Sequence, residues 1–199
     1  RRDIEKSITD TNVARSGSEP RKSASLMTWI TNGSVGAGSG AFSAGTGTDT
    51  VTDGDDRALT LALIEDGMQD AWTDGGNPSM MLASATNRAN FSDLSASGNL
   101  VSNDVNMTAA KEVAYVGSTS VFLTDFGTVE ATPSRFMSND KMFLLDPEFA
   151  SLCTLNGRNF QEKDMGDTGD SQATMLITEW ALKVLAPKAH AGIFDLSGS

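Results

Sequence analysis

The spacing of apolar side chains changes along this chain, and that change limits the folds open to it. Between residues 57 and 73 apolar side chains recur at helical spacing, whereas beyond Lys111 they alternate with polar ones, as in strands. The spacing predicts a helix over 57–73 and a β-hairpin over 113–137 with its turn at Asp125–Gly127. A chain of 199 residues is long enough for one domain, or one domain with two lobes. We therefore expect an α+β fold.

Shorter patterns predict the remaining elements. Two amphipathic stretches predict helices over 1–15 and 85–94. Apolar runs bounded by glycine, proline or polar residues predict strands over 24–31, 78–84, 142–145, 174–185 and 189–196.

The segment 32–56 consists mainly of Gly, Ser, Thr and Asp, with almost no large side chain. Because it has too little apolar surface to offset the entropy cost of ordering, we expect one long mobile connection. Its last acidic residues, Asp53, Asp55 and Asp56, would then stand at the start of the 57–73 helix, where the helix dipole favours negative charge.

The charge and the cysteine content limit the classes of function. A formal net charge of −11 disfavours a dedicated nucleic-acid-binding module, because such binding depends on Lys and Arg displacing counterions from phosphates. An acidic wall that encloses DNA without holding it is compatible with this charge. The single cysteine, Cys153, cannot form an internal disulfide, and no stretch reaches the roughly 20 apolar residues of a membrane-spanning helix. We expect a soluble, intracellular protein.

The candidate catalytic residues lack partners in the sequence. His190 lies among small and apolar residues, where a lone histidine is more often structural than catalytic. Cys153 lies in the run ASLCTL and is expected to pack as a small apolar side chain. The glycines of 33–40 lack the Lys and Ser/Thr of a phosphate-binding loop, and Asp125–Gly127 lacks the other kinase motifs. We predict no enzymatic activity.

Two acidic clusters contain oxygen ligands of the kind that calcium prefers. One comprises Asp49, Asp53, Asp55 and Asp56, and the other Asp164, Asp167 and Asp170. Neither matches the twelve-residue calcium loop with its terminal Glu, so solvated loops are the favoured interpretation. We predict no metal and no cofactor.

Six segments resemble one group of tailed-bacteriophage major capsid proteins with the Hong Kong 97-like fold. They occur in the same order as in that group and span nearly the whole chain. The segments are RRDIEKSI, LMTWITNG, WTDGGNPSMMLAS, TDFGTVEATPSRFM, LLDPEFASLCTL and GDSQATMLITEWALKVLAPKAHAGIFDL.

The resemblance implies a peripheral domain and an axial domain. Residues 1–56 would hold the end of the long spine helix, a peripheral strand and the Gly-rich loop. Residues 57–170 would be mostly axial, and 171–199 would return to the peripheral sheet. The N-terminal arm and extended loop of that group have no counterpart in the sequence, and we expect them upstream of Arg1.

The function implied is that of a major capsid protein. It would self-assemble into pentamers and hexamers that form an icosahedral head around double-stranded DNA, in the virion, after assembly in the host cytoplasm. Its partners would be itself and other capsid, decoration or portal proteins, without sequence-specific DNA binding and without a membrane. As the intersubunit surface we predict the polar face of the 57–73 helix and an acidic loop, with residues Asp66, Gln69, Asp70, Asp164, Asp167 and Asp170.

Three other readings predict different behaviour. A bacterial nanocompartment shell protein of the same fold would enclose an enzyme cargo instead of a genome. A virion decoration or binding domain held by calcium would lose stability on chelation. A hydrolase that uses His190 with an acidic residue would lose activity on His190→Ala.

Overall fold

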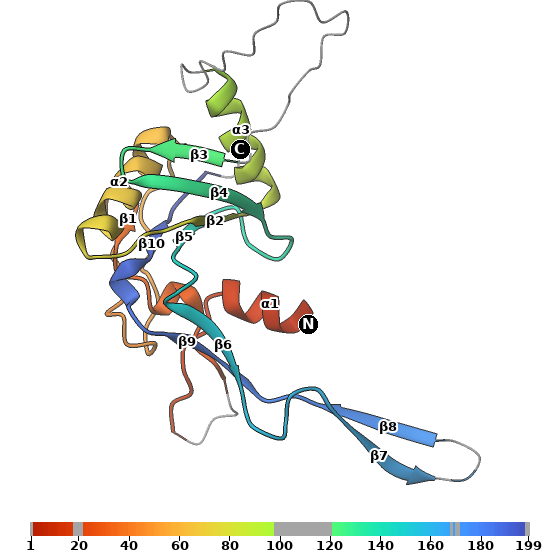
Figure 1. The fold of residues 1–199 in the computed structure, drawn as a ribbon. Coiled ribbons are helices and arrows are strands. Elements are labelled where there is room, and N and C mark those ends of the chain that lie inside the picture. The colour runs from red at the N-terminus through yellow and green to blue at the C-terminus, as the bar shows by residue number, and fades with distance from the viewer. Residues whose placement is uncertain (1, 18–21, 98–120, 168, 170–171, 198–199) are drawn as a thin grey trace, which may run out of the picture.

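A six-stranded sheet forms the centre of the protein (Figure 1). The computed structural model describes residues 2–17, 22–97, 121–167, 169 and 172–197. The strand order is β1-β10-β5-β2-β4-β3, in which the pairs β1–β10 and β2–β4 are parallel and the others antiparallel. The strands are Gly33–Ser34 (β1), Met80–Ala83 (β2), Val121–Thr124 (β3), Gly127–Pro133 (β4), Met142–Leu145 (β5) and Ala191–Ile193 (β10).

Helices α2 (Leu61–Thr73) and α3 (Ala85–Ser97) cover one face of this sheet. Ile64, Met68 and Ala71 of α2 and Phe91 of α3 are fully buried there. They pack with sheet residues that share one strand face, because alternate residues of a strand point the same way. These sheet residues are Met81, Ala83, Phe122, Val129, Ala131, Met142, Leu144, Ala191 and Ile193.

The opposite face of the sheet is covered by the N-terminal third of the chain. A 3-10 helix, η1 (Leu26–Thr28), follows the N-terminal helix α1 (Arg2–Thr9), and both lie on this side together with part of the Gly-rich segment. The second core cluster comprises Leu26, Met27, Ile30, Val51, Met137, Phe143, Leu145 and Phe194. Because both faces are covered, all four residues of β5 are buried.

The predicted elements on the α2–α3 side are largely confirmed. The 57–73 helix exists but begins at Leu61, where the Thr60 hydroxyl accepts a hydrogen bond from the Leu63 amide. The prediction that Asp53, Asp55 and Asp56 stand at the start of this helix is therefore wrong, because all three precede the Thr60 cap. The strand at 78–84, the helix at 85–94 and the hairpin turn at Asp125 and Phe126 are all present. The first part of the predicted hairpin, 113–120, lies outside the described residues.

The predicted strand at 24–31 is wrong. Its apolar residues are buried as expected, but Leu26–Thr28 forms a 3-10 helix in which the Leu26 carbonyl accepts hydrogen bonds from Trp29 and Ile30. A short apolar run cannot by its spacing distinguish a buried strand from a buried helical turn. The predicted helix at 1–15 is also shorter, because α1 ends at Thr9.

The Gly-rich segment packs against the body, where we had expected a mobile connection. Ala41 and Thr52 form an antiparallel bridge, and Gly36 and Gly54 approach each other closely. A Cβ atom on Gly54 would lie 2.5 Å from the Gly36 carbonyl oxygen, and one on Gly36 would lie 2.3 Å from the Asp55 carbonyl oxygen. Real Cβ contacts are longer than this, so the segment needs glycine for the close approach of its own backbone.

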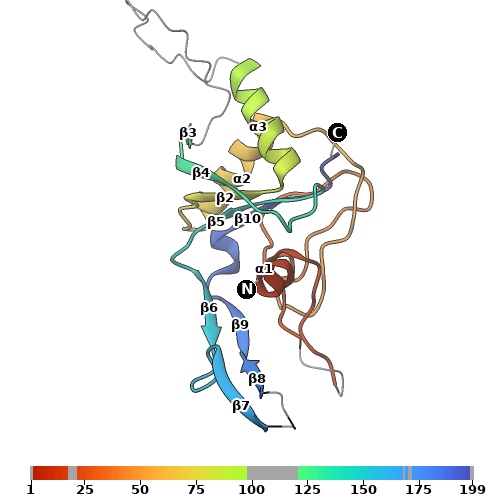
Figure 2. The same ribbon diagram turned by 90° about the vertical axis from the view of Figure 1, so that its right-hand side faces the viewer.

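A long two-stranded ribbon, residues 150–184, extends away from the sheet (Figures 1 and 2). Near the body β6 (Ala150–Thr154) pairs with β9 (Trp180–Val184), and farther out β7 (Gln161–Asp167) pairs with β8 (Gln172–Ile177). The predicted continuous strand at 174–185 is thus two strands, interrupted at Thr178 and Glu179 where the partner changes from β7 to β6.

The chain returns from the ribbon into the middle of the central sheet. A second 3-10 helix, η2 (Pro187–Ala189), follows β9, and β10 then lies between β1 and β5. The predicted strand at 189–196 is therefore reduced to Ala191–Ile193. The described part of the predicted 171–199 unit, residues 172–197, contributes to two places, the ribbon and the central sheet.

Candidate assembly surfaces

The ribbon exposes large apolar side chains along its whole length. In a two-stranded sheet each side chain has one cross-strand neighbour and no further layer, so apolar residues stay in solvent unless something covers them. Met165 on β7 is 61% exposed and Leu176 on β8 is 64% exposed. Among the ribbon residues with an assigned exposure, the exposed large apolar side chains are Leu152, Leu155, Phe160, Met165, Met175 and Leu176.

The cross-strand pairs mix apolar and charged residues in the outer half of the ribbon. Glu162 lies opposite Leu176, Lys163 opposite Met175, and Asp164 opposite Thr174, whose hydroxyl donates a hydrogen bond to the Asp164 carboxylate. In the inner half Leu152 lies opposite Leu182, which packs against the second core cluster. The ribbon is thus anchored at its base and exposed at its tip.

His190 fixes the base of the ribbon to the body. Its ring is fully buried, and Nδ1 accepts a hydrogen bond of 3.0 Å from the Asp146 backbone amide, just before the turn into β6. The Asp146 carboxylate itself accepts hydrogen bonds from the backbone amides of Asn77 and Glu148. Because Nδ1 is an acceptor, the ring is neutral with its proton on Nε2. This placement agrees with the predicted structural role of His190 and leaves the ring remote from solvent.

Burial lowers the pKa of His190 below its ordinary value of 6.5, while the Asp146 carboxylate and the Phe149 backbone act in the opposite direction. A folded-state pKa below the unfolded value means that the unfolded chain binds the proton more readily. The stability contributed by the neutral ring is therefore present above about pH 6.5 and is lost as the pH falls towards the lower folded-state pKa.

We expect the free energy of unfolding to fall more steeply between about pH 7.5 and about pH 5 in the wild type than in the variant His190→Asn. The asparagine amide oxygen retains an acceptor for the Asp146 amide but does not titrate. Urea denaturation at the two pH values checks this. The carboxylates are common to both proteins, so equal pH dependence would contradict the assignment to His190.

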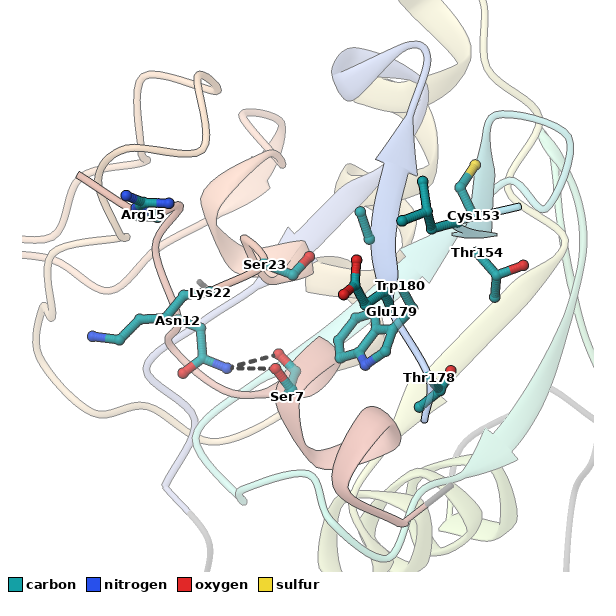
Figure 3. A pocket seen from close by; sticks show the side chains of 12 residues that line it. Ser7, Asn12, Arg15, Lys22, Ser23, Cys153, Thr154, Thr178, Glu179 and Trp180 are labelled. Carbon is teal, nitrogen blue, oxygen red and sulfur yellow. Dashed lines mark hydrogen bonds between the residues drawn. The ribbon is translucent and has the colours of Figure 1, made fainter. Parts of the chain in front are cut away.

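A groove lies between the N-terminal segment and the ribbon (Figure 3). Its volume is about 970 Å³. Figure 3 shows Asn12, Arg15 and Lys22 on one side, with Thr178, Glu179 and Trp180 of the ribbon on the other. The lining residues are Ser7, Asn12, Arg15, Lys22, Ser23, Cys153, Thr154, Leu155, Thr178, Glu179, Trp180 and Ala181.

Polar contacts hold the two sides of the groove in place. The Ser23 hydroxyl accepts a hydrogen bond from the Leu182 amide of β9, and Asn12 donates hydrogen bonds to Ser7 at the end of α1. Glu179 forms an ion pair with Arg158. The charged residues that line the groove are Arg15, Lys22 and Glu179.

The predicted intersubunit residues fall into two separate groups. Asp66, Gln69 and Asp70 are exposed on one face of α2, as predicted from helical spacing. Asp164 is exposed on β7 and Asp167 lies at the end of that strand, so this acidic region is a strand of the ribbon and not the loop that we expected. Asp170 lies outside the described residues. Figures 1 and 2 place α2 and β7 at opposite ends of the protein.

Sequence reasoning missed the groove and misplaced Cys153. Cys153 is exposed on β6 and lines the groove, whereas we had expected it to pack as a small apolar side chain. The apolar run around it had suggested burial, but the partner strand is the only layer that the ribbon supplies. One signal in the sequence could have indicated the exposed ribbon. The acidic and basic residues between 158 and 167 are unusual for a buried strand.

Metal and membrane sites find no support in the described part of the chain. No group of three or more His, Cys, Asp or Glu side chains gathers there as a metal site would require. None of the described helices is both long and apolar enough to cross a membrane.

The fold matches that of a virus capsid protein. The cyanophage A-1(L) capsid asymmetric unit is similar with a TM-score of 0.52 and 14% sequence identity, over 72% of this chain and 49% of that chain. This likeness supports the Hong Kong 97-like capsid fold that the six sequence segments had indicated. The class that this likeness defines is a class of fold, the Hong Kong 97-like fold.

The family is shown by the sequence. The family model described as SU10 major capsid protein matches residues 1–197, so the chain belongs to the SU10 major capsid protein family. A comparison with curated protein sequences gave no match.

Two further solved structures are similar at lower scores. The holo-SrpI encapsulin complex from Synechococcus elongatus PCC 7942 has a TM-score of 0.47 and 18% identity, over 71% of this chain and 51% of that chain. The satellite phage P4 procapsid including size determination (Sid) protein has a TM-score of 0.44 and 10% identity, over 86% of this chain and 59% of that chain. The chain spans roughly half the length of the solved structures that it matches.

Proposed function

We propose that this chain is the structural subunit of a virus head and that it works by associating with copies of itself. The observation that carries this proposal is the ribbon, whose apolar side chains are exposed on the isolated subunit. An isolated two-stranded hairpin is at best marginally stable in water. Burial of apolar surface lowers the free energy of the buried state by about 25 cal/mol per Å². The outer part of the ribbon, strands β7 and β8, therefore gains stability when other subunits cover it. Because the chain belongs to a major capsid protein family, we propose that the covering subunits are further copies of this chain.

The assembly proposed is a closed icosahedral head built from pentamers and hexamers. Head-to-tail contacts between different surfaces of one subunit close into such rings. The net charge of −11 suits a wall that encloses double-stranded DNA without binding a particular sequence. The protein would then belong to the virion, after assembly in the host cytoplasm, with other capsid, decoration or portal proteins as further partners.

The division into peripheral and axial parts is also a proposal. We assign α1 and the ribbon to the peripheral part, and the central sheet with α2 and α3 to the axial part. The border at residue 170 falls between the paired strands β7 and β8, so we move the border to the base of the ribbon near Asp146.

Electron microscopy of the purified full-length protein tests the function. Closed shells with nucleic acid inside native particles are expected, whereas persistent monomers would contradict the proposal. Shells whose contents are an enzyme would instead identify a nanocompartment.

Charge reversal in the same preparation tests the proposed α2 surface. Asp66→Lys combined with Asp70→Lys is expected to reduce shell formation, because both carboxylates are exposed on α2 and would lie between subunits. The matched control is Asp93→Lys on the exposed side of α3. If the α2 variant formed shells as fully as the wild type, the proposal that α2 lies between subunits would be wrong.

A further inference from the structure

We propose that Asn156 is a site of spontaneous covalent modification, at which the side-chain amide of the folded protein converts to a carboxylic acid through a succinimide ring. The sequence contains Asn followed by Gly twice, at Asn32–Gly33 and at Asn156–Gly157. Glycine after asparagine favours this reaction, because glycine has no Cβ atom to hinder the approach of the side chain to the backbone. The two pairs lie in different surroundings, and only the second is free to react.

Asn156 and Gly157 form the corner of an exposed turn on the ribbon. The Arg158 amide donates a hydrogen bond of 2.9 Å to the Leu155 carbonyl, which closes a four-residue turn with Gly157 at its third position. Gly157 has a φ of 77°, as a type II turn requires there. A Cβ atom on Gly157 would meet no atom within 4 Å beyond its chain neighbours. Among the described residues, neither the Asn156 side chain nor the Gly157 N–H has a hydrogen-bond partner, so both reacting groups are unobstructed.

The reaction needs only water as a co-reactant. The Gly157 backbone nitrogen loses its proton and attacks Cγ of Asn156, the Cγ–Nδ2 bond breaks, and Nδ2 takes up a proton and leaves as ammonia. Water then opens the ring at either carbonyl carbon, which gives aspartate or isoaspartate. Because the nitrogen attacks only after it has lost its proton, the rate rises with pH.

The pair Asn32–Gly33 is held away from this reaction. The Asn32 Nδ2 group donates hydrogen bonds of 2.7 Å to the Asp74 carboxylate and 2.8 Å to the Lys188 carbonyl. Gly33 lies in β1, where a Cβ atom would come 2.2 Å from a backbone oxygen of β10. Cyclisation there would have to break two hydrogen bonds and move a strand of the central sheet, whereas the exposed turn has no such restraint.

The products change the place at which the inner and outer halves of the ribbon join. Leu155 and Arg158 flank the turn, and both form backbone hydrogen bonds with Glu179 on the other side of the ribbon. Isoaspartate adds a methylene group to the backbone between them, which weakens the hydrogen bond from Arg158 to Leu155. We expect hydrogen exchange at the Arg158 amide to be faster in the isoaspartate form than in fresh protein. Equal exchange rates would refute this part of the proposal.

Peptide mapping of aged protein tests the site itself, because trypsin places each Asn–Gly pair in a separate peptide. Residues 23–57 contain Asn32 and residues 142–158 contain Asn156, with no other Asn or Gln in either peptide. Dissociated full-length subunits are incubated in mildly alkaline buffer and digested at mildly acidic pH, and mass spectrometry measures the conversion of amide to acid. We expect conversion at Asn156 to be at least roughly tenfold faster than at Asn32, because Asn32 would lose two hydrogen bonds.

Two controls identify the cause of the difference. In urea-denatured protein neither pair is protected, and we expect both to convert at similar rates. Asn156→Gln keeps an exposed amide but needs a larger ring, so we expect no conversion in its 142–158 peptide. Equal rates at Asn32 and Asn156 in folded subunits would overturn the proposal, as would an intact Asn156 in folded protein once the denatured chain has converted. Because the subunits are dissociated, none of these outcomes depends on shell formation.

Discussion

Replacing Phe143 with alanine is expected to lower the free energy of unfolding by about 3 to 5 kcal/mol. Phe143 is fully buried in the middle of β5, the strand that pairs with β10 on one side and β2 on the other. Its ring packs edge-on against Phe194 at a centroid distance of 5.9 Å. Removing the ring leaves a cavity between the sheet and the N-terminal layer, and neighbouring side chains held on paired strands relax into it only in part.

Urea denaturation of dissociated subunits measures this loss, because association with other subunits would add to the apparent stability. Leu152→Ala on β6 is the matched control. Leu152 is 45% exposed on the ribbon, so its truncation is expected to cost about 1 kcal/mol or less. Similar losses for the two variants would contradict the assignment of the core to the central sheet.

Replacing Asp195 with alanine is expected to lower the free energy of unfolding by roughly 1.5 to 3 kcal/mol. The Asp195 carboxylate is buried and accepts a hydrogen bond of 2.7 Å from the Gly36 amide, which joins the Gly-rich segment to the end of β10. The same carboxylate counteracts burial in setting the pKa of Arg57, which burial lowers. Alanine would leave the Gly36 amide unsatisfied and Arg57 without its nearby negative charge.

The backbone of Asp195 gives the control. Its φ of 58° lies in the left-handed region, which Asn and Asp tolerate better than most residues. Asp195→Asn keeps both this conformation and a hydrogen-bond acceptor for Gly36, so we expect it to lose less stability than Asp195→Ala. Thermal or urea denaturation of both variants measures the difference. If the alanine variant were as stable as the wild type, the link between the Gly-rich segment and β10 would not contribute to stability.

The central sheet and the outer ribbon differ in how much of their surface the same subunit covers. The central sheet is covered on both faces by chain from the same subunit, whereas the outer ribbon has neither face covered in the described residues. We therefore expect mutations in the sheet to act first on folding, and mutations in β7 and β8 to act first on the proposed association between subunits. This separation allows the assembly variants to be examined in folded subunits.

The sequence by itself determined the elements whose partners are close along the chain. The apolar spacing of α2 and the turn at Asp125 and Phe126 depend on residues only a few positions apart, so local pattern is sufficient to predict them. The order of six segments likewise indicated the capsid family, which the family model confirms over 1–197. The exposed face of α2, with Asp66, Gln69 and Asp70, followed from the same helical spacing.

Tertiary structure alone decided where the remaining apolar residues go. The runs at 24–31 and 174–185 look alike as apolar segments, yet the first becomes a buried 3-10 helix and the second becomes two strands of an exposed ribbon. The Gly-rich segment packs because Gly36 meets Asp195, a residue far away in the chain. Spacing reports which side chains share a face, but burial depends on which distant segment arrives to cover that face. The groove and the exposed ribbon are products of those long-range contacts, and for that reason no local pattern predicted them.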